Sequence, residues 1–184
     1  MSADHPIDTI ILTGVAGSGK TTVGLALAKR IGWTFCDADD LHDAESIESI
    51  RRNQPLDDAD RAPWLRRVRA VIERTRQEGG AIVIACSALK QRYRETLAGG
   101  LTGIRFVFLT GEAALLRERL QERRGHFAGA ALLDSQLAEL EPPRDALTVD
   151  IALPVDAIVD LIVSELPTSE KSKPQKKRGR DTAG

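Results

Sequence analysis

Hydrophobic residues along this chain fall into two kinds of stretch, which predict two kinds of element. Short runs rich in β-branched residues predict five buried strands, at residues 9–13, 33–37, 81–86, 104–109 and 147–151. Apolar residues at helical spacing predict helices over residues 22–31, 41–52, 63–77, 90–97, 113–123, 132–140 and 155–166. Strands that alternate with helices predict an α/β fold, with a parallel sheet covered by helices on both faces in three layers.

The first predicted strand leads into a glycine-rich loop and then a helix. The loop is Gly14-Val15-Ala16-Gly17-Ser18-Gly19-Lys20-Thr21, and it matches the phosphate-binding pattern Gly-x-x-x-x-Gly-Lys-[Ser/Thr]. A flexible Gly/Ser turn is the alternative, but the flanking strand and helix favour a P-loop. We expect its amides to bind phosphates, with Lys20 on the β- and γ-phosphates and Thr21 on Mg²⁺. The sequence therefore predicts a P-loop NTPase fold that binds a nucleoside triphosphate.

Carboxylates follow the second predicted strand, at the sheet edge where ligands bind in such folds. If the strand continues past Asp37, alternation points Asp37 and Asp39 the same way. One could hold the Mg²⁺ water shell while the other accepts a proton from an acceptor hydroxyl. The alternative is a cluster of helix N-caps, which is the favoured interpretation for Asp40.

Three other polar groups are candidates for substrate contact. Ser87 and Lys90 follow the third strand, although Ser87 could instead cap a helix. Arg61 ends an acidic loop over residues 53–60, for which an exposed loop with an N-cap at Asp60 is the alternative.

A cluster of arginines precedes a glycine-containing break near residue 125. An arginine in a mobile lid can close over the phosphates and stabilise the negative charge that develops during phosphoryl transfer. Arg119 and Arg123 are the candidates for this role. A solvated helix face is the alternative for Arg117 and Arg124, and a structural role is the alternative for His126.

Composition fits one domain of a globular protein. The 184 residues are 42% hydrophobic and 29% charged, and no apolar run approaches the roughly 20 residues of a membrane span. Asp4 and Asp8 stand where a secretory signal would be basic, and two cysteines give no disulfide framework. We therefore expect a cytoplasmic protein with reduced thiols.

Charge separates the C-terminal segment from the rest. Residues 167–184 carry a net charge of +4 and residues 1–166 a net charge of −5. We expect a disordered basic tail. Its function could be to bind nucleic acid or another acidic surface; the alternative is a tail that only improves solubility. Aromatic residues make up only 4% of the chain, so a nucleic-acid platform is not expected. Asn53 is the only asparagine, so the Asn-Lys-x-Asp guanine motif is absent.

Several motifs together resemble gluconokinases of the P-loop type, relatives of shikimate and nucleoside-monophosphate kinases. They are Gly14 to Thr22; Asp37-x-Asp39-x-Leu41-His42; Pro55-Leu56-x-Asp58-x-Asp60-Arg61-x-Pro63-Trp64-Leu65; Cys86-Ser87-Ala88-Leu89-Lys90-x-x-Tyr93-Arg94; Arg123-x-Gly125-His126-Phe127; and Leu133, Ser135-Gln136 and Leu140-Glu141-Pro142. The resemblance implies transfer of phosphate from Mg-ATP to D-gluconate, giving 6-phosphogluconate, in a homodimer.

The resemblance also assigns expected roles. A kinase domain would span residues 9–166 after a stub at 1–8, with a substrate-covering segment at about 40–62 and a lid at about 119–136. The expected catalytic residues are Lys20, Asp39 and Arg123, and Thr21 and Asp37 would hold the metal. The expected nucleotide-binding residues are Gly14, Val15, Ala16, Gly17, Ser18, Gly19, Lys20, Thr21, Thr22, Arg119 and Arg123. The expected substrate-binding residues are Asp39, His42, Arg61, Ser87, Lys90, His126 and Gln136, with Arg61 the first choice for the carboxylate.

Departures from the family pattern lie in the substrate-covering segment. They are Ala38, Asp43, Ser46, Ser49-Ile50 and Asn53. Two other functions therefore stay open: a kinase for another small hydroxy acid or polyol, and an ATP-binding regulator with a nucleic-acid-binding tail.

Overall fold

The computed structural model describes residues 6–52, 57–122 and 128–166. Within these ranges the strands are Thr9–Thr13 (β1), Thr34–Asp37 (β2), Ile82–Ala85 (β3), Ile104–Thr110 (β4) and Leu147–Asp150 (β5). The helices are Lys20–Ile31 (α1), Ala44–Arg51 (α2), Asp58–Gln77 (α3), Gln91–Ala98 (α4), Ala113–Glu122 (α5), Ala128–Glu139 (α6) and Val155–Ser164 (α7), with a 3₁₀ helix (η1) at Ala38–Leu41.

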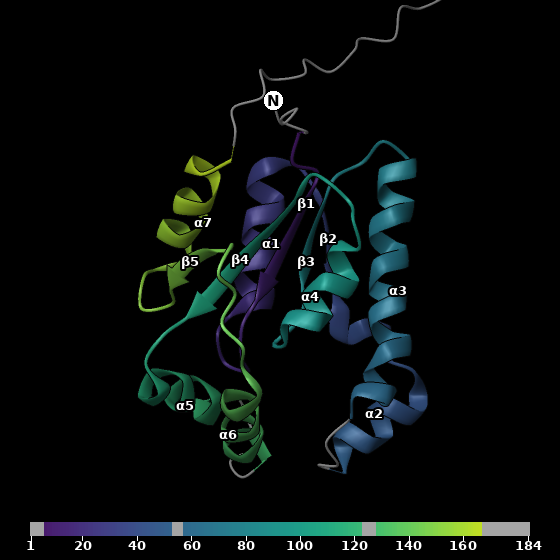
Figure 1. The fold of residues 1–184 in the computed structure, drawn as a ribbon. Helices are drawn as coiled ribbons and strands as arrows, with labels where there is room; N and C mark the ends of the chain where they lie inside the picture. Colours follow the sequence, from purple (N-terminus) through teal and green to yellow (C-terminus); the bar gives the residue numbers. More distant parts are fainter. Residues whose placement is uncertain (1–5, 53–56, 123–127, 167–184) are drawn as a thin grey trace, which may run out of the picture.

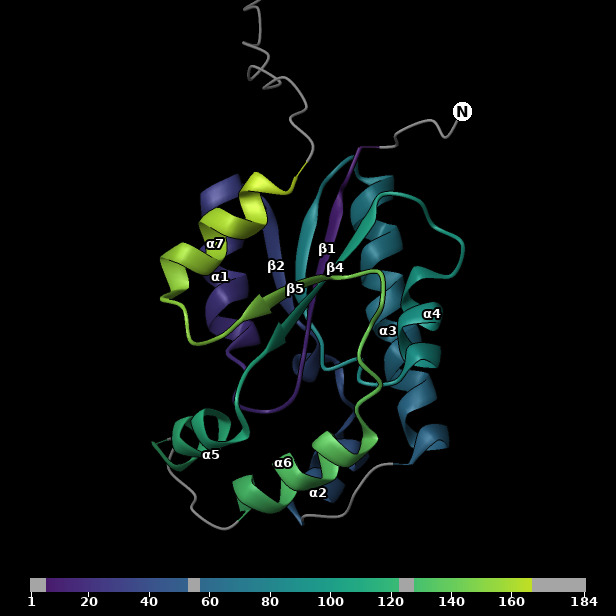
Figure 2. The ribbon, with the colours of Figure 1, turned by 60° about the vertical axis from the view of Figure 1, so that its left-hand side comes forward.

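The five strands form one parallel sheet in the order β2-β3-β1-β4-β5. Strand β1 is central, since Thr9 pairs with Ile82 on one side and with Ile104 on the other. Helices α1 and α7 cover one face of the sheet, and α3 and α4 cover the other (Figures 1 and 2). The predicted three-layer α/β fold is thus confirmed. Because all strands run the same way, their carboxyl ends meet at one edge, beside α2, α5 and α6 (Figure 1).

Alternate residues of the strands bury their side chains in two separate cores. Ile10 and Leu12 of β1 pack with Leu27 of α1 and Ile158 of α7. Ile11, between them, packs on the opposite face with the core of α3 and α4. The continuous apolar run of β1 therefore serves both layers, as expected for a central parallel strand.

Helix α3 begins at Asp58, five residues before the predicted start at Pro63. Its N-cap is Asp57, whose side chain accepts from the Asp60 N–H while the Asp60 side chain accepts from the Asp57 N–H. This capping box satisfies two N–H groups that a helix start leaves unpaired. The predicted loop to residue 60 is wrong, and so is the alternative of an N-cap at Asp60, because Asp60 is the third residue of the helix.

The second strand also ends differently from the continuation considered above. Strand β2 stops at Asp37, and η1 begins at Ala38. The side chains of Asp37 and Asp39 are therefore not oriented by the alternation of side chains along a strand. Asp37 caps η1 by accepting from the Asp39 N–H at 3.1 Å, and Asp40 lies inside η1 rather than capping a helix. Helix α2 starts at Ala44 instead of residue 41, and α6 starts at Ala128 instead of residue 132.

Cys86 is buried and Cys36 half-buried, and both are free thiols, as expected. Burial raises the pKa of Cys86 to about 12, so this thiol stays protonated and unreactive. No helix within the described ranges is long and apolar enough to cross a membrane. The predicted roles of Arg123, His126 and residues 167–184 fall outside the described residues.

Candidate active site

The P-loop links β1 to α1 and depends on glycine at its tightest points. Gly17 has a φ of +82°, and a Cβ there would lie 2.9 Å from the Leu116 carbonyl oxygen. Helix α1 starts after Gly19 with neither a side-chain cap nor an acidic residue in its first turn, as far as the described residues go. Such a helix start binds anions through its amides and its dipole.

Lys20 and Ser18 complete the loop. The Lys20 Nζ donates to the carbonyl oxygens of Gly14 at 2.9 Å and Val15 at 3.1 Å, which folds the ammonium onto the loop. The Ser18 hydroxyl is buried and has no hydrogen-bond partner within the described ranges. A buried hydroxyl without a partner is costly, so its presence fits a loop that is completed by a ligand.

Thr21 and the two strand-end carboxylates lie next to the loop. The Thr21 Oγ1 donates to the Asp37 Oδ2 at 2.7 Å, which joins the start of α1 to the end of β2. Asp39 is exposed to solvent, yet partial desolvation, followed by repulsion from Asp37, raises its pKa, while Lys20 counteracts this shift. The Asp39 carboxylate is therefore a stronger base than an ordinary aspartate.

His42 follows η1 and lies on Trp64 of α3. Its ring stacks on Trp64 with centroids 4.6 Å apart, and the Trp64 Nε1 donates to the Ala38 carbonyl at 2.6 Å. Burial lowers the pKa of His42 and outweighs the opposite effect of Asp39. The imidazole is thus neutral at pH 7 and can both donate and accept hydrogen bonds.

The loop after β3 is held to the P-loop and to α4. The Ser87 carbonyl accepts from the Thr13 hydroxyl and from the Gly14 N–H. The Arg94 guanidinium is buried and donates to the carbonyls of Ala88 at 2.9 Å and Leu89 at 3.0 Å. The N-cap of α4 is Lys90, so Ser87 does not cap this helix and the capping alternative is excluded.

A basic cluster lies beside this loop, built from Arg61 of α3 and Lys90. The Arg61 Nη1 donates to the Glu139 Oε2 at 2.8 Å and to the Tyr93 hydroxyl at 3.1 Å. The Lys90 Nζ lies 3.2 Å from the Asp58 Oδ1 and 3.8 Å from the Glu139 Oε2. Burial works to lower the pKa of both basic groups, but their carboxylate and tyrosine partners outweigh it and raise the pKa of each.

Gln136 lies away from this basic cluster and on the P-loop. Its Oε1 accepts from the Ala16 N–H at 2.6 Å, so α6 contacts the P-loop. Sequence reasoning assigned Gln136 to the acceptor, and it missed Glu139 altogether. No local sequence pattern indicates either contact, because Gln136 is 120 residues from Ala16 and Glu139 is 78 residues from Arg61 in the chain.

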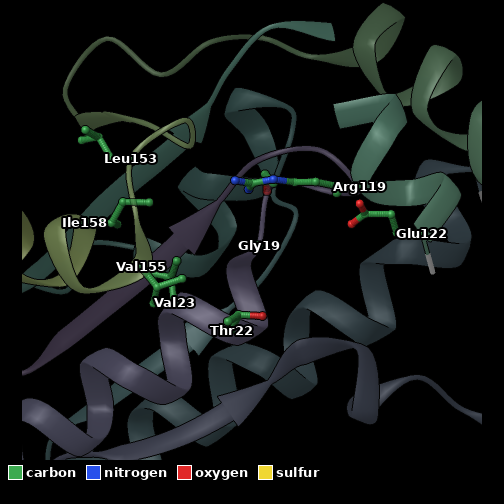
Figure 3. Close-up of a pocket in the computed structure, with 10 residues that line it drawn as sticks. Gly19, Thr22, Val23, Arg119, Glu122, Leu153, Val155 and Ile158 are labelled. Atoms are coloured by element: carbon green, nitrogen blue, oxygen red, sulfur yellow. The ribbon is translucent and has the colours of Figure 1, made fainter. Parts of the chain in front are cut away.

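A pocket of about 270 Å³ opens beside the P-loop, between α5 and the loop that follows β5 (Figure 3). Arg119 extends from α5 toward Gly19 and donates from Nη2 to the Ile151 carbonyl at 2.7 Å. The opposite wall is apolar and was not predicted; it consists of Leu153, Val155 and Ile158. A guanidinium facing apolar side chains suits a flat aromatic ring next to phosphates.

The departures at Asp43 and Ser46 form a local structure of their own. The Asp43 Oδ1 accepts from the Ser46 N–H at 2.8 Å, and its Oδ2 pairs with the Arg67 Nη2 at 3.0 Å. These interactions, the Ser46 hydrogen bonds first, hold the pKa of Asp43 at about 2. Asp43 therefore anchors the start of α2 to α3.

The parallel sheet, the P-loop at its carboxyl edge and the acid beside it define a P-loop kinase. A family model described as an AAA domain matches residues 10–143. A probable gluconokinase of Xenopus tropicalis is 44% identical over 85% of this chain and 90% of its own. A gluconokinase of Gluconobacter oxydans is 43% identical over 85% of this chain and 88% of its own. A crystal structure of a gluconokinase from Sinorhizobium meliloti superposes with a TM-score of 0.77 and 40% identity, covering 88% and 93% of the two chains.

The chain belongs to the gluconokinase family of P-loop kinases.

Proposed function

We propose that this protein phosphorylates D-gluconate with ATP and yields 6-phospho-D-gluconate. The observation that carries the proposal is the meeting, at one sheet edge, of a P-loop, a carboxylate base and a basic pair. Lys20 and Thr21 come from the P-loop, Asp39 from η1, Arg61 from α3 and Lys90 from the start of α4. A triphosphate and a hydroxy acid could then lie on either side of Asp39.

On the donor side, the P-loop amides and Lys20 hold the triphosphate and stabilise the charge that shifts during transfer. The Thr21 hydroxyl and the Asp37 carboxylate are 2.7 Å apart, and such oxygen donors fit Mg²⁺ held partly by protein and partly by phosphates. The described residues contain no group of three or more His, Cys, Asp or Glu side chains that could hold a metal ion. When bound, Mg²⁺ neutralises phosphate charge.

On the acceptor side, Asp39 orients the attacking hydroxyl and takes its proton, aided by its raised pKa. The planar Arg61 guanidinium, with Lys90, binds the acid's carboxylate. Neutral His42 and the Ser87 hydroxyl contact the other hydroxyl groups.

The pocket beside the P-loop holds the nucleotide base, with Arg119 over the ring. Replacing Arg119 with alanine should raise the KM for ATP about tenfold, because a desolvated cation–π contact contributes about 1–2 kcal/mol. The KM for gluconate should change little. Steady-state kinetics measure both, with Arg117→Ala as control, since Arg117 lies on the same helix in an exposed pair with Asp134. Equal effects of the two variants on the ATP KM would contradict the assignment.

Other parts of the proposal extend beyond the described site. Residues 40–62 would cover the acceptor, and residues 119–136 would form a lid that brings Arg123 to the phosphates and His126 to the acceptor. We also propose a homodimer in the cytoplasm, with residues 167–184 as a solubilising tail and with no nucleic-acid partner.

The test is an assay of the purified protein with Mg-ATP and a panel of sugar acids and polyols. Product should form with gluconate at a rate well above that of the Lys20→Ala variant. Equal or faster turnover of a different acid would move the assignment to that acceptor.

A further inference from the structure

Glu139, the last residue of α6, occupies the basic pair to which the acceptor's carboxylate is assigned. Its Oε2 lies 2.8 Å from the Arg61 Nη1 and 3.8 Å from the Lys90 Nζ, and all three side chains are largely buried, at 29%, 20% and 18% exposure. A carboxylate on a planar guanidinium is the arrangement that a bound hydroxy acid would itself make. Glu139 is therefore an internal counterpart of the acceptor's acid group.

The helix gives no local reason for an anion at this position. Glu139 lies at the C-terminal end of α6, where the helix dipole disfavours negative charge. The ion pair with Arg61 must offset this effect. Because a partly buried pair gains little net free energy, a second carboxylate can replace Glu139 at small cost.

The same helix contacts the nucleotide side through Gln136. Residues 136 and 139 are three apart, so both project from one side of α6. The Gln136 Oε1 accepts from the Ala16 N–H at 2.6 Å, at a loop whose amides are suited to phosphate oxygens. One helix thus places an oxygen acceptor on each half of the site.

We propose that Glu139 is a specificity-determining and positioning residue that couples the two substrates; this inference rests on the proposed function. In the free protein, Glu139 holds Arg61 and Lys90, and Gln136 holds the Ala16 amide. The carboxylate of the acceptor displaces Glu139, which loosens α6 and releases Gln136 from the P-loop. Acceptor and triphosphate then favour each other's binding by the same factor.

This arrangement selects acids over neutral polyols. A polyol of the same length lacks the carboxylate that must replace Glu139, so it leaves α6 on the P-loop. The selection acts through nucleotide affinity as well as through contact with the acceptor, and it limits ATP binding when no acid is present.

The test measures the dissociation constant of a non-hydrolysable ATP analogue, with Mg²⁺, for the full chain and for Glu139→Gln. Without an acceptor, Glu139→Gln should bind the analogue at least about fivefold more tightly than the wild type, a ratio at the lower end of allosteric coupling. Saturating gluconate should tighten wild-type binding by a similar factor and leave Glu139→Gln unchanged. The gluconate KM of Glu139→Gln should also fall, since residue 139 no longer competes with the acceptor's carboxylate for Arg61.

Asp134→Asn is the matched control, because it removes another carboxylate of α6 in an exposed pair with Arg117. It should behave as the wild type. Equal analogue affinity of the wild type and Glu139→Gln, with both proteins folded by circular dichroism, would overturn the inference even if gluconate is phosphorylated. If Glu139→Gln binds the analogue more tightly but gluconate does not change binding by the wild type, the proposed role of the α6 contact stands and gluconate is not the acceptor.

Discussion

Replacing Lys20 with alanine should lower kcat/KM by about 10³-fold while leaving the fold intact. The Lys20 Nζ is the charged donor of the P-loop and lies on the Gly14 and Val15 carbonyls. Removing one donor that stabilises developing charge costs about 10²–10³-fold in rate, and a cation on the transferred phosphate belongs at the upper end. Steady-state kinetics and a thermal melt measure the two quantities.

The control is Lys29→Ala, in the exposed last turn of the same helix. It removes an equal charge from α1 but leaves the phosphate side untouched, so its kcat/KM should stay near that of the wild type. A Lys20→Ala enzyme with more than a tenth of wild-type activity would show that the triphosphate does not bind this loop as proposed.

Asp39→Asn should lower kcat by about 10²–10⁴-fold, the contribution typical of a positioned general base. The amide keeps the size of the side chain but cannot take the proton of the attacking hydroxyl. Stability at pH 7 should not fall. The fold raises the pKa of Asp39, so the ionised carboxylate destabilises the folded protein at pH values above that pKa. Replacing it with a neutral amide removes this cost.

The pH profile gives a second readout of the same residue. Only ionised Asp39 can accept a proton, so activity should fall as pH drops through its pKa, which lies above the ordinary value of 3.8. The acid limb should disappear in Asp39→Asn. Asp40→Asn, the neighbour within η1, should keep both the rate and the limb, and an equal loss in both variants would contradict the assignment.

The parts of the fold that sequence predicted are those with a local cause. The P-loop requires glycine at fixed positions, and Gly17 indeed has a positive φ and a close contact with Leu116. The strands were visible because the central ones are buried on both faces and hence continuously apolar. The start of α3 was missed although the Asp57 and Asp60 pair was present, because Pro63 suggested a later start.

What sequence could not predict depends on distant contacts. Leu153 and Val155 line the pocket beside Arg119, but they resemble any apolar residues around a last strand and helix. The contact of Gln136 with Ala16 and that of Glu139 with Arg61 arise only when α6 folds across the sheet edge. Motif matching named residues of both halves but not how α6 connects them.

The departures from the family pattern are partly explained by the structure. Asp43 accepts a hydrogen bond from the Ser46 N–H and pairs with Arg67, so the two unusual residues contact each other. Asp43 thus anchors the start of α2 to α3.

The most direct measurement is the product formed by the purified full chain with Mg-ATP and gluconate. We predict formation of 6-phosphogluconate in step with ADP, at a rate about 10³-fold above that of Lys20→Ala. ATP consumption without that product, or product no greater than the Lys20→Ala background, would contradict the proposal that this protein is a gluconate kinase.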